Sequence, residues 1–406
     1  MFAQPARSEV RTLPRASSTV VDRWILTRIQ ALVRSAPIRF ALWDGFEISP
    51  PSGPAVATIA FRRRAALLRW VWDPELYFGE DYMSGAVEID GDLVALLEAV
   101  YRAFGPSSRP SWSRHHVNGA EAAKDNVHSH YDLGNDFYRL WLDRDMVYTC
   151  AYFPTADATL EAAQAAKMDR VCRKLTLQAG ERVVEAGCGW GALALFMAKR
   201  YGVTVRAFNL SSEQIAYARA RAADEGLTHR VEFVDDDYRN LSGQYDAFVS
   251  IGMLEHVGAG NYRELGALMS RSITPEGRGL VHSIGRDKPG QLNAWIDKRI
   301  FPGAHPPTLR EMMDLFEPND LSVLDVENIR LHYARTLEHW LERYEETVDK
   351  VSAMFDETFV RAWRLYLVGS IAAFTTGKLQ LFQVLYARSG AKNVPWTRKH
   401  VYDGHP

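Results

Sequence analysis

Cysteine is scarce in this sequence, and its charges nearly balance. The three cysteines, Cys150, Cys172 and Cys188, are odd in number, and no two of them have metal-ligand spacing. We therefore expect neither a disulfide framework nor a metal site, and a reducing, cytoplasmic location is the simplest interpretation. The net charge of −2 argues against a general nucleic-acid-binding protein, which would normally contain a strongly basic domain.

Long hydrophobic runs are missing as well. The best one, residues 365–374, is too short to cross a bilayer, which takes about 20 residues. Residues 1–18 contain no apolar run that could serve as a signal peptide. We therefore expect any membrane contact to be peripheral, at the inner face of the membrane. The 406 residues, 47% hydrophobic and 24% charged, have the composition of a globular protein and favour two domains.

The pattern along the chain predicts four segments. Residues 1–18, rich in Ser, Arg and Pro, are expected to form a disordered leader. Residues 19–105 mix helical and strand-like patterns, which indicates a small α+β domain. Residues 106–125 are polar and contain Gly, Pro and Ser, so they are interpreted as a linker. Residues 126–406 would then form the larger, second domain.

The larger domain alternates strand and helix patterns. Helical periodicity covers residues 192–200 and 212–223. The expected strands are residues 182–185, 203–208, 231–234, 247–251 and 279–284. This alternation predicts an α/β fold with an open, mainly parallel sheet covered by helices. Ligands of such folds bind outside the carboxyl ends of the strands.

A glycine-rich turn follows the first expected strand. Gly187, Gly189 and Gly191 stand in the sequence E-A-G-C-G-W-G, where glycine lets a ligand approach the backbone. Their spacing does not fit the dinucleotide fingerprint G-x-G-x-x-G. The pattern E-x-G-x-G-x-G is instead typical of class I methyltransferases, which bind S-adenosylmethionine, and the acid at Glu185 suits the amino-acid portion of that cofactor. The alternative is a tight turn that binds no ligand.

Polar residues also follow the next two strands. Asn209 stands where many such enzymes place an acid for the ribose hydroxyls, and Gln214 could reach the cofactor from the following helix. Asp236 and Asp237 follow the third strand, where an acid usually accepts a hydrogen bond from the adenine amine. A solvated loop is the alternative for this acidic run.

Four longer motifs narrow the interpretation: H-Y-D-L-G-N-D-F-Y (130–138), M-V-Y-T-C-A-Y-F (146–153), S-I-G-M-L-E-H-V-G (250–258) and F-P-G (301–303). Together they strongly resemble the cyclopropane-fatty-acyl-phospholipid synthases and mycolic acid cyclopropane synthases, over roughly residues 125–390. The resemblance implies a class I methyltransferase with a Rossmann-like, mainly parallel seven-stranded sheet and a smaller N-terminal lipid-binding domain. It also implies transfer of a methyl(ene) group from S-adenosylmethionine to the double bond of an unsaturated phospholipid acyl chain.

The resemblance further implies a bound bicarbonate ion that takes a proton from the new methyl group, because a strongly basic side chain beside the sulfonium would risk alkylation. The carried-over contacts are the backbone of Cys150 and Ile284, the side chains of Glu255 and His282, and the hydroxyl of Tyr333. Each side chain has a structural alternative: an inert buried thiol, a helix cap, a core histidine and a packing tyrosine. A Glu-His-Cys metal site is conceivable, but no short-spaced ligand motif supports it.

The resemblance implies a set of cofactor contacts, with Tyr131 closing over the cofactor as part of a lid. The set comprises Tyr131, Thr149, Glu185, Gly187, Gly189, Leu210, Gln214, Asp236, Asp237 and Ile251.

An acyl chain inside a bilayer must be reached from its surface, so we expect a docking site. Arg62–Arg64 could meet anionic headgroups, and tryptophans favour the interface. The apolar candidates beside them are Leu67, Leu68, Trp70 and Trp72. A basic edge over ordinary core residues is an equally good interpretation.

Other questions stay open at this level. The segment 359–386 has a helical pattern that could line an acyl tunnel or bury a subunit contact, and the resemblance implies a homodimer. The same substrate could instead yield a methyl-branched or methylated unsaturated product. Methylation of a small amine, or a non-catalytic lipid-binding role, are the remaining alternatives.

Overall fold

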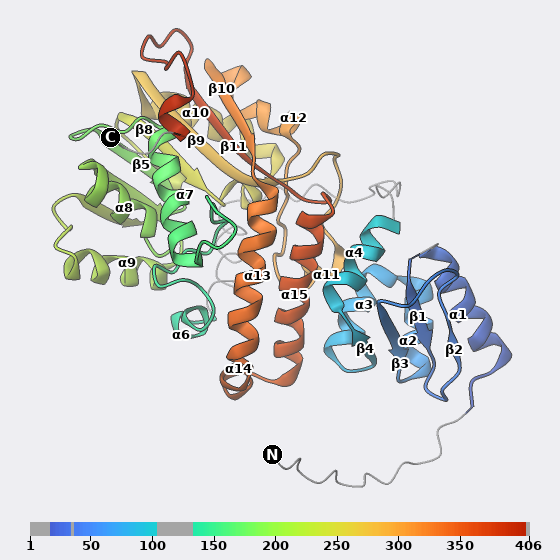
Figure 1. Ribbon diagram of the computed structural model, residues 1–406. Coiled ribbons are helices and arrows are strands. Elements are labelled where there is room, and N and C mark those ends of the chain that lie inside the picture. Colours follow the sequence, from blue (N-terminus) through green and yellow to red (C-terminus); the bar gives the residue numbers. More distant parts are fainter. Residues whose placement is uncertain (1–16, 34–35, 104–132, 403–406) are drawn as a thin grey trace. The chain divides into compact units, whose positions relative to one another are not determined.

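The computed structural model describes residues 17–33, 36–103 and 133–402 (Figure 1). The chain divides into two compact units, residues 1–104 and 105–406. The predicted linker 106–125 and most of the predicted leader lie outside the described residues. Ser18, the last residue of that leader, is held in place because its amide donates a hydrogen bond to Asp44 Oδ2 at 2.7 Å.

The N-terminal unit is an α+β structure with a four-stranded sheet in the order β2-β1-β3-β4. Its strands are β1 (Ile38–Ala41), β2 (Glu47–Ile48), β3 (Ala57–Phe61) and β4 (Val87–Gly91). Its helices are α1 (Val20–Leu32), α2 (Arg64–Trp72), α3 (Pro74–Met83) and α4 (Leu93–Ala103). β1 and β3 run parallel, while the two edge strands are antiparallel to their neighbours.

In helix α2, some side chains of the expected docking segment are exposed and could contact a membrane, and others are buried. Leu67 and Trp70 are buried in the core of the unit, so their expected place at a membrane surface was wrong. Leu68 and Trp72 lie on the other side of the helix and are 47% and 86% exposed. The helical period explains the split, because residues three apart share a face and adjacent residues do not.

The second unit contains a seven-stranded sheet in the order β10-β11-β9-β8-β5-β6-β7. The strands β5 to β9 run parallel, whereas β11 is antiparallel to both of its neighbours, β9 and β10. Their bounds are β5 (Arg182–Ala186), β6 (Thr204–Asn209), β7 (Val231–Asp235), β8 (Tyr245–Ile251), β9 (Ile273–Gly285), β10 (Leu321–Asn328) and β11 (Gln380–Arg388). The predicted class I methyltransferase sheet is thereby confirmed.

Helices cover both faces of this sheet. One face packs against α7 (Leu160–Lys174), α8 (Ala192–Tyr201) and α9 (Ser212–Asp224). The opposite face packs against α10 (Tyr262–Ser272) and α12 (Leu309–Met312). Figure 1 shows two long helices, α13 (Arg330–Glu346) and α15 (Glu357–Thr375), lying side by side. The shorter helices are α6 (Asn135–Arg139), α11 (Ala294–Arg299), α14 (Val348–Met354) and α16 (Lys399–Tyr402).

The segment 359–386 is not one helix. α15 ends at Thr375, Gly377 turns the chain at φ +76°, and strand β11 begins at Gln380. Every residue of β11 except the last is buried, because β11 lies between two strands and both of its faces are covered. A continuous apolar run of this kind has no strand periodicity, so it cannot be distinguished from a buried helix by pattern alone.

None of the helices in the described part of the chain combines the length and the apolarity that a membrane crossing demands.

Candidate active site

The turn between β5 and α8 is closely packed at its end and open at its middle. Gly191, at φ +83°, sits so near the neighbouring elements that a Cβ atom there would lie 2.6 Å from the Phe233 ring and 2.9 Å from Ala218 Cβ. At Gly189, φ +53°, a Cβ atom would meet no described neighbour within 4 Å. The middle of the turn therefore offers bare backbone to open space, as the approach of a ligand requires.

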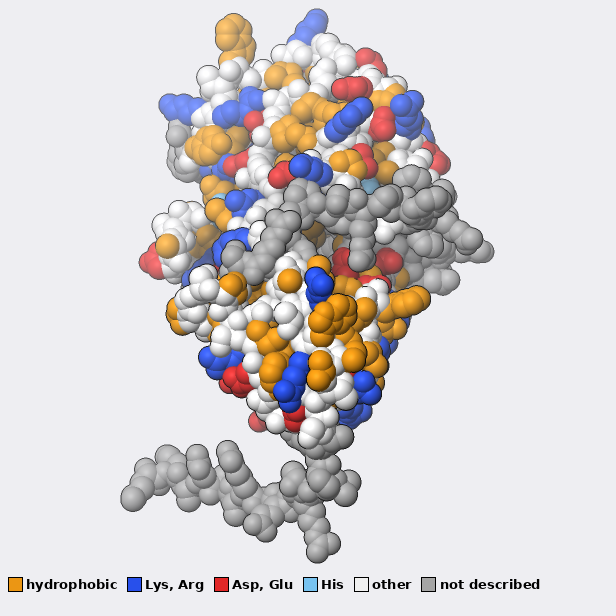
Figure 2. Space-filling view, turned by 90° about the vertical axis from the view of Figure 1, so that its right-hand side faces the viewer, with side chains coloured by type: hydrophobic (Ala, Val, Ile, Leu, Met, Phe, Trp, Pro, Cys, Tyr) orange, Lys and Arg blue, Asp and Glu red, His pale blue; other side chains and the backbone are white. Residues whose placement is uncertain are grey.

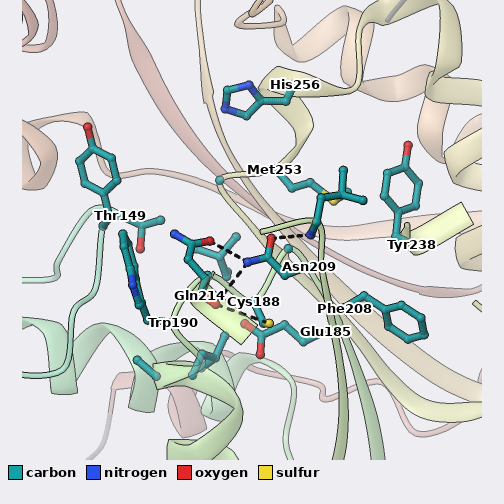
Figure 3. A pocket seen from close by; sticks show the side chains of 18 of the residues that line it. Thr149, Glu185, Cys188, Trp190, Phe208, Asn209, Gln214, Tyr238, Met253 and His256 are labelled. Carbon is teal, nitrogen blue, oxygen red and sulfur yellow. Dashed lines mark hydrogen bonds between the residues drawn. The ribbon is translucent and has the colours of Figure 1, made fainter. Parts of the chain in front are cut away.

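A pocket lies beside this turn, at the carboxyl ends of β5, β6, β7 and β8 (Figure 3). This is the edge where ligands bind in open α/β sheets. The predicted cofactor residues that line it are Thr149, Glu185, Gly187, Gly189, Leu210, Gln214, Asp236 and Ile251. Tyr131 lies outside the described residues.

Asp237 does not belong to the lining, in contrast to our expectation. Its Oδ1 accepts a hydrogen bond from the Arg239 amide at 2.9 Å, and its Oδ2 pairs with the Arg239 guanidinium at 2.7 Å. Asp237 thus caps the short 3-10 helix η1 (Tyr238–Asn240), and both of its carboxylate oxygens are engaged by Arg239. Of the two adjacent acids, Asp236 is the one that lines the pocket.

Asn209 organises the end of β6. Its Nδ2 donates to Gln214 Oε1 at 2.7 Å and to the Gly189 carbonyl at 3.3 Å, while its Oδ1 accepts from the Leu210 amide at 2.9 Å (Figure 3). This one side chain therefore ties the glycine turn to the start of α9. An acid at position 209 could accept the Leu210 hydrogen bond but could not donate to the other two groups.

Two buried charged residues face the same pocket. Lys167, from the apolar side of α7, donates from Nζ to Thr149 Oγ1 at 3.0 Å. Glu185, on β5, is also buried, and its Oε2 has no hydrogen-bond partner among the described residues. Burial lowers the pKa of Lys167 to about 8 and raises the pKa of Glu185 to about 8, because both charged forms lose their hydration. Lys167 was not among the residues expected from the sequence, although a lysine on an apolar helix face is a signal that could have revealed it.

Next to the pocket lies a second buried carboxylate, Glu255. It belongs to the 3-10 helix η2 (Leu254–His256), and the pocket-lining residues Met253 and His256 flank it closely in sequence. Glu255 Oε1 accepts a hydrogen bond from the Ile284 amide at 2.5 Å, while Oε2 has no partner among the described residues. Burial raises the pKa of Glu255 to about 7. The backbone of Ile284 was expected to contact bicarbonate, and in this structure its amide is engaged by Glu255.

Helix α13 contacts the backbone beside Cys150 and also contains Tyr333. Cys150 is fully buried, and the amide of the next residue, Ala151, donates to Thr336 Oγ1 at 3.0 Å. Tyr333 lies three residues before Thr336 and therefore on the same helix face. Its ring stacks on Phe374 with 4.6 Å between the ring centroids. Burial raises the pKa of the Cys150 thiol, so its side chain stays protonated.

His282 lies on β9, two residues before Ile284, and faces Gln383 on β11 in the sheet register. The Gln383 amide nitrogen and His282 Nδ1 are 3.1 Å apart. Burial lowers the pKa of this imidazole, and the Lys167 and Lys174 charges lower it further. A neutral histidine is the result. Among the described residues that line the pocket there is none of the five predicted anion residues, but Lys167, which does line it, acts electrostatically on Cys150 and His282.

The described residues contain no group of three His, Cys, Asp or Glu side chains that could hold a metal ion.

Comparison with known proteins identifies the family. The family model of the mycolic acid cyclopropane synthetases matches residues 119–384. The chain belongs to this family of S-adenosylmethionine-dependent methyltransferases. A second model, of a domain of unknown function, matches residues 26–109.

Members of the family resemble this chain over most of its length. A probable fatty acid methyltransferase from Pseudomonas putida is 37% identical over 388 residues, 90% of this chain and 96% of that protein. The cyclopropane-fatty-acyl-phospholipid synthase of Escherichia coli strain K12 is 37% identical over 353 residues, 84% of this chain and 90% of that one. The crystal structure of mycolic acid cyclopropane synthase CmaA1 with SAH and CTAB is 29% identical, covers 65% of this chain and 98% of its own, and has a TM-score of 0.62.

Within this family fold, the pocket has further walls that sequence analysis did not assign. His256 is partly buried and lines the pocket, and loss of hydration lowers its pKa to about 4, so it stays neutral. Trp190 also lines it, and its Nε1 donates to Asn135 Oδ1 at 2.6 Å. Met253 packs beside Gly187, where a Cβ atom would lie 3.0 Å from Met253 Cβ. Their apolar or aromatic character gives no sequence signal that separates them from core residues.

Proposed function

We propose that this protein transfers a methyl group from S-adenosylmethionine to the double bond of an unsaturated fatty acyl chain of a membrane phospholipid, and that a cyclopropane ring then closes. The proposal rests on Glu255, a buried carboxylate with one oxygen fixed by a backbone amide and the other without a partner at the edge of the cofactor pocket.

The pocket suits S-adenosylmethionine in shape and charge. Gly189 leaves space where a side chain would otherwise lie, and Glu185 presents an unpartnered oxygen that can accept hydrogen bonds from an ammonium group. Gln214, near the start of α9, lies beside the glycine-rich turn and can contact the ribose or the methionine portion of the cofactor. These residues bind and orient the cofactor, so that its sulfonium methyl is presented to the substrate at a fixed position.

The reaction needs a proton acceptor that is not alkylated itself. Methyl transfer to an alkene leaves a carbocation, and the ring closes when the new methyl group loses a proton. Bound bicarbonate would supply that base. Glu255 fits such an ion because Oε2 needs a partner, and with its raised pKa it can either donate to or accept from the ion near neutral pH. His282, Tyr333 and the backbone near Cys150 would complete the site.

The surroundings favour a dry reaction. Tyr148 and Trp190 line the pocket and also belong to a cluster of aromatic rings on α6, α13 and α15. Trp141 and Trp340, in that cluster, are fully buried, and Tyr148 and Tyr366 are hydrogen-bonded through their hydroxyl groups at 2.9 Å. Such walls exclude water from the alkene and the carbocation, and aromatic faces stabilise cations.

The N-terminal unit offers a surface for docking on a membrane. Exposed apolar side chains lie on two helices that pack together, α1 and α2, and Figure 2 shows hydrophobic side chains gathered beside Lys and Arg on the face that it presents. Trp72 is 86% and Trp24 58% exposed, and the Arg28 guanidinium lies 5.1 Å from the Trp24 ring centroid. Tryptophan and arginine together suit the interface of an anionic bilayer. We accordingly propose a peripheral enzyme at the inner face of the membrane.

A second outcome keeps the cofactor and the lipid but not the ring. The Pseudomonas relative, matched over 90% of this chain, is described as a probable fatty acid methyltransferase. If the carbocation loses a different proton, the product is a methylated unsaturated chain; if a hydride shift is followed by reduction by a partner reductase, which supplies the hydride, the product is a methyl-branched chain. The candidate anion residues are all present here, which favours the cyclopropane.

The test is to incubate purified protein with S-adenosylmethionine, bicarbonate and liposomes of monounsaturated phospholipid, followed by mass spectrometry with double-bond derivatisation. We expect the fatty acid to gain one CH2 and to lose its derivatisable double bond. The same gain with the double bond retained would establish the methylated alkene instead. Unchanged lipid, despite cofactor binding, would refute the lipid substrate and direct attention to soluble amines. Sedimentation equilibrium of the same preparation tests the proposed homodimer.

A further inference from the structure

We propose that Lys167 binds the carboxylate of S-adenosylmethionine opposite Glu185, so that two buried side chains of opposite charge hold the two charges of the amino-acid portion. The proposal rests on the proposed use of that cofactor, and adds a residue with no role so far. The alternative is that Lys167 merely braces the loop that contains Thr149.

The hydrogen bonding of Lys167 is incomplete. An ammonium group has three donors, and Thr149 Oγ1 is the acceptor that the described residues offer to Nζ, at 3.0 Å. Lys167 is only 2% exposed and makes no ion pair with any described carboxylate, although its charge acts on Glu185 and Asp143. A buried ammonium without a counter-ion is costly. A carboxylate delivered by a ligand would remove that cost.

Within the described part of the chain, Glu185 lacks a hydrogen-bond donor, just as Lys167 lacks acceptors. Its side chain lies in the same pocket wall, 2% exposed, and its Oε2 has no described hydrogen-bond partner. Lys167 and Glu185 are therefore a base and an acid that line one cavity without pairing with each other, and with the pKa of each at about 8 a zwitterionic ligand can draw both into their charged forms. An α-amino acid group is a zwitterion, and its two charges match this arrangement in sign.

The loop that contains Thr149 is held by a second residue of α7 besides Lys167. Gln164, three residues earlier on the same face of α7, donates from Nε2 to the Thr149 carbonyl at 2.8 Å. The Thr149 loop is thus anchored by Gln164, independently of Lys167. Bracing by Lys167 alone would duplicate a contact that already exists, whereas binding of an anion would not.

The experiment compares two ligands that differ in the amino-acid portion. S-adenosylhomocysteine contains it, and 5′-methylthioadenosine does not. In Lys167→Met, isothermal titration calorimetry should show S-adenosylhomocysteine binding weakened on the order of 10- to 100-fold, as expected for one charged hydrogen bond, with methylthioadenosine binding unchanged. Glu185→Gln should show the same selectivity. Lys174→Met is the matched control, because Lys174 is equally buried on α7 but pairs with Glu327 at 2.6 Å, outside the pocket lining.

Several outcomes would overturn the proposal. Equal weakening of both ligands in Lys167→Met would show that Lys167 only braces the loop. Unchanged S-adenosylhomocysteine affinity with an altered bicarbonate requirement would assign Lys167 to that anion. If Lys167→Met does not fold, wild-type protein suffices: decarboxylated S-adenosylhomocysteine should bind at least about tenfold more weakly than the intact ligand, and equal binding would contradict the assignment. A wild-type protein that binds neither ligand would instead refute the proposed function itself.

Discussion

The Ile284 amide donates a hydrogen bond of 2.5 Å to Glu255 Oε1 and thereby fixes a carboxylate whose second oxygen has no partner among the described residues. The contact joins a loop after β8 to the far end of β9. It determines the direction in which Oε2 points.

Glu255 should reduce the stability of the fold at high pH. Burial raises its pKa from 4.5 to about 7, so the folded chain binds its proton more tightly than the unfolded chain. Stability is then lost as the pH rises from about 4.5 to about 7. At 1.4 kcal/mol per pKa unit, the loss is on the order of 3 kcal/mol.

The measurement compares Glu255→Gln with wild-type protein by urea unfolding at pH 5 and pH 8. The variant should be the more stable one at pH 8, with little difference at pH 5, while methyl transfer is lost. A difference that does not depend on pH would contradict the raised pKa.

Two glycines of the same turn should respond to alanine in opposite ways. Gly191→Ala places a Cβ atom against Phe233 and Ala218 at φ +83° and should destabilise the fold by roughly 1–3 kcal/mol or more. Gly189→Ala should carry only the smaller backbone strain of φ +53°, because its methyl group has space; since that space belongs to the pocket, cofactor affinity should fall about tenfold or more. Thermal unfolding and calorimetric titration of both variants separate the effects. If both variants lost the same stability, a steric requirement of the fold, and not the open space for a ligand, would explain why position 189 is a glycine.

Trp72 should contribute to membrane binding without contributing to folding. A large apolar side chain gains about 1.5–3 kcal/mol on full burial, so Trp72→Ser should weaken binding to anionic vesicles by roughly tenfold, with an unchanged melting temperature. Trp396→Ser is the control, since Trp396 is fully exposed in the other unit. Vesicle co-sedimentation gives the answer, and equal effects of the two substitutions would count against the α1–α2 surface.

The cysteines should be unreactive in the native protein. All three are buried, and burial raises the pKa of each thiol above its usual value. Because the thiolate is the reactive form, iodoacetamide at pH 8 should modify none of them in the time that labels all three in urea. Mass spectrometry of the intact protein counts the adducts. Rapid native labelling at Cys150 would mean that its side chain, and not only its backbone, faces the site.

Much of the second unit could be predicted because its strands and turns are marked by alternating patterns, glycines and capping residues that can be recognised in the sequence alone. The strand before the glycine turn was expected at 182–185 and is found at Arg182–Ala186, and the helix expected at 212–223 is found at Ser212–Asp224. These elements alternate in pattern and begin or end at glycine or at a capping residue such as Ser211.

Other features depend on tertiary structure that a sequence does not display. The fully buried strand β11 looked helical because neither of its faces is polar. Asp236 lines the pocket while Asp237 accepts a hydrogen bond from the Arg239 amide two residues later, a local contact that the sequence does not reveal. In the sequence, Lys167 cannot be distinguished from other lysines on helices. Only the structure shows that it contacts Thr149 and lines the pocket.

The position of β11 also constrains the order in which the protein can be assembled during synthesis. This strand lies between β9 and β10, which both precede it in the chain, and β10 has no other strand partner in the sheet. Until residue 388 has left the ribosome, β9 presents an unpaired edge and His282 lacks Gln383. The nascent chain therefore passes through a stage with an open sheet edge, the kind of surface that invites aggregation and recruits chaperones.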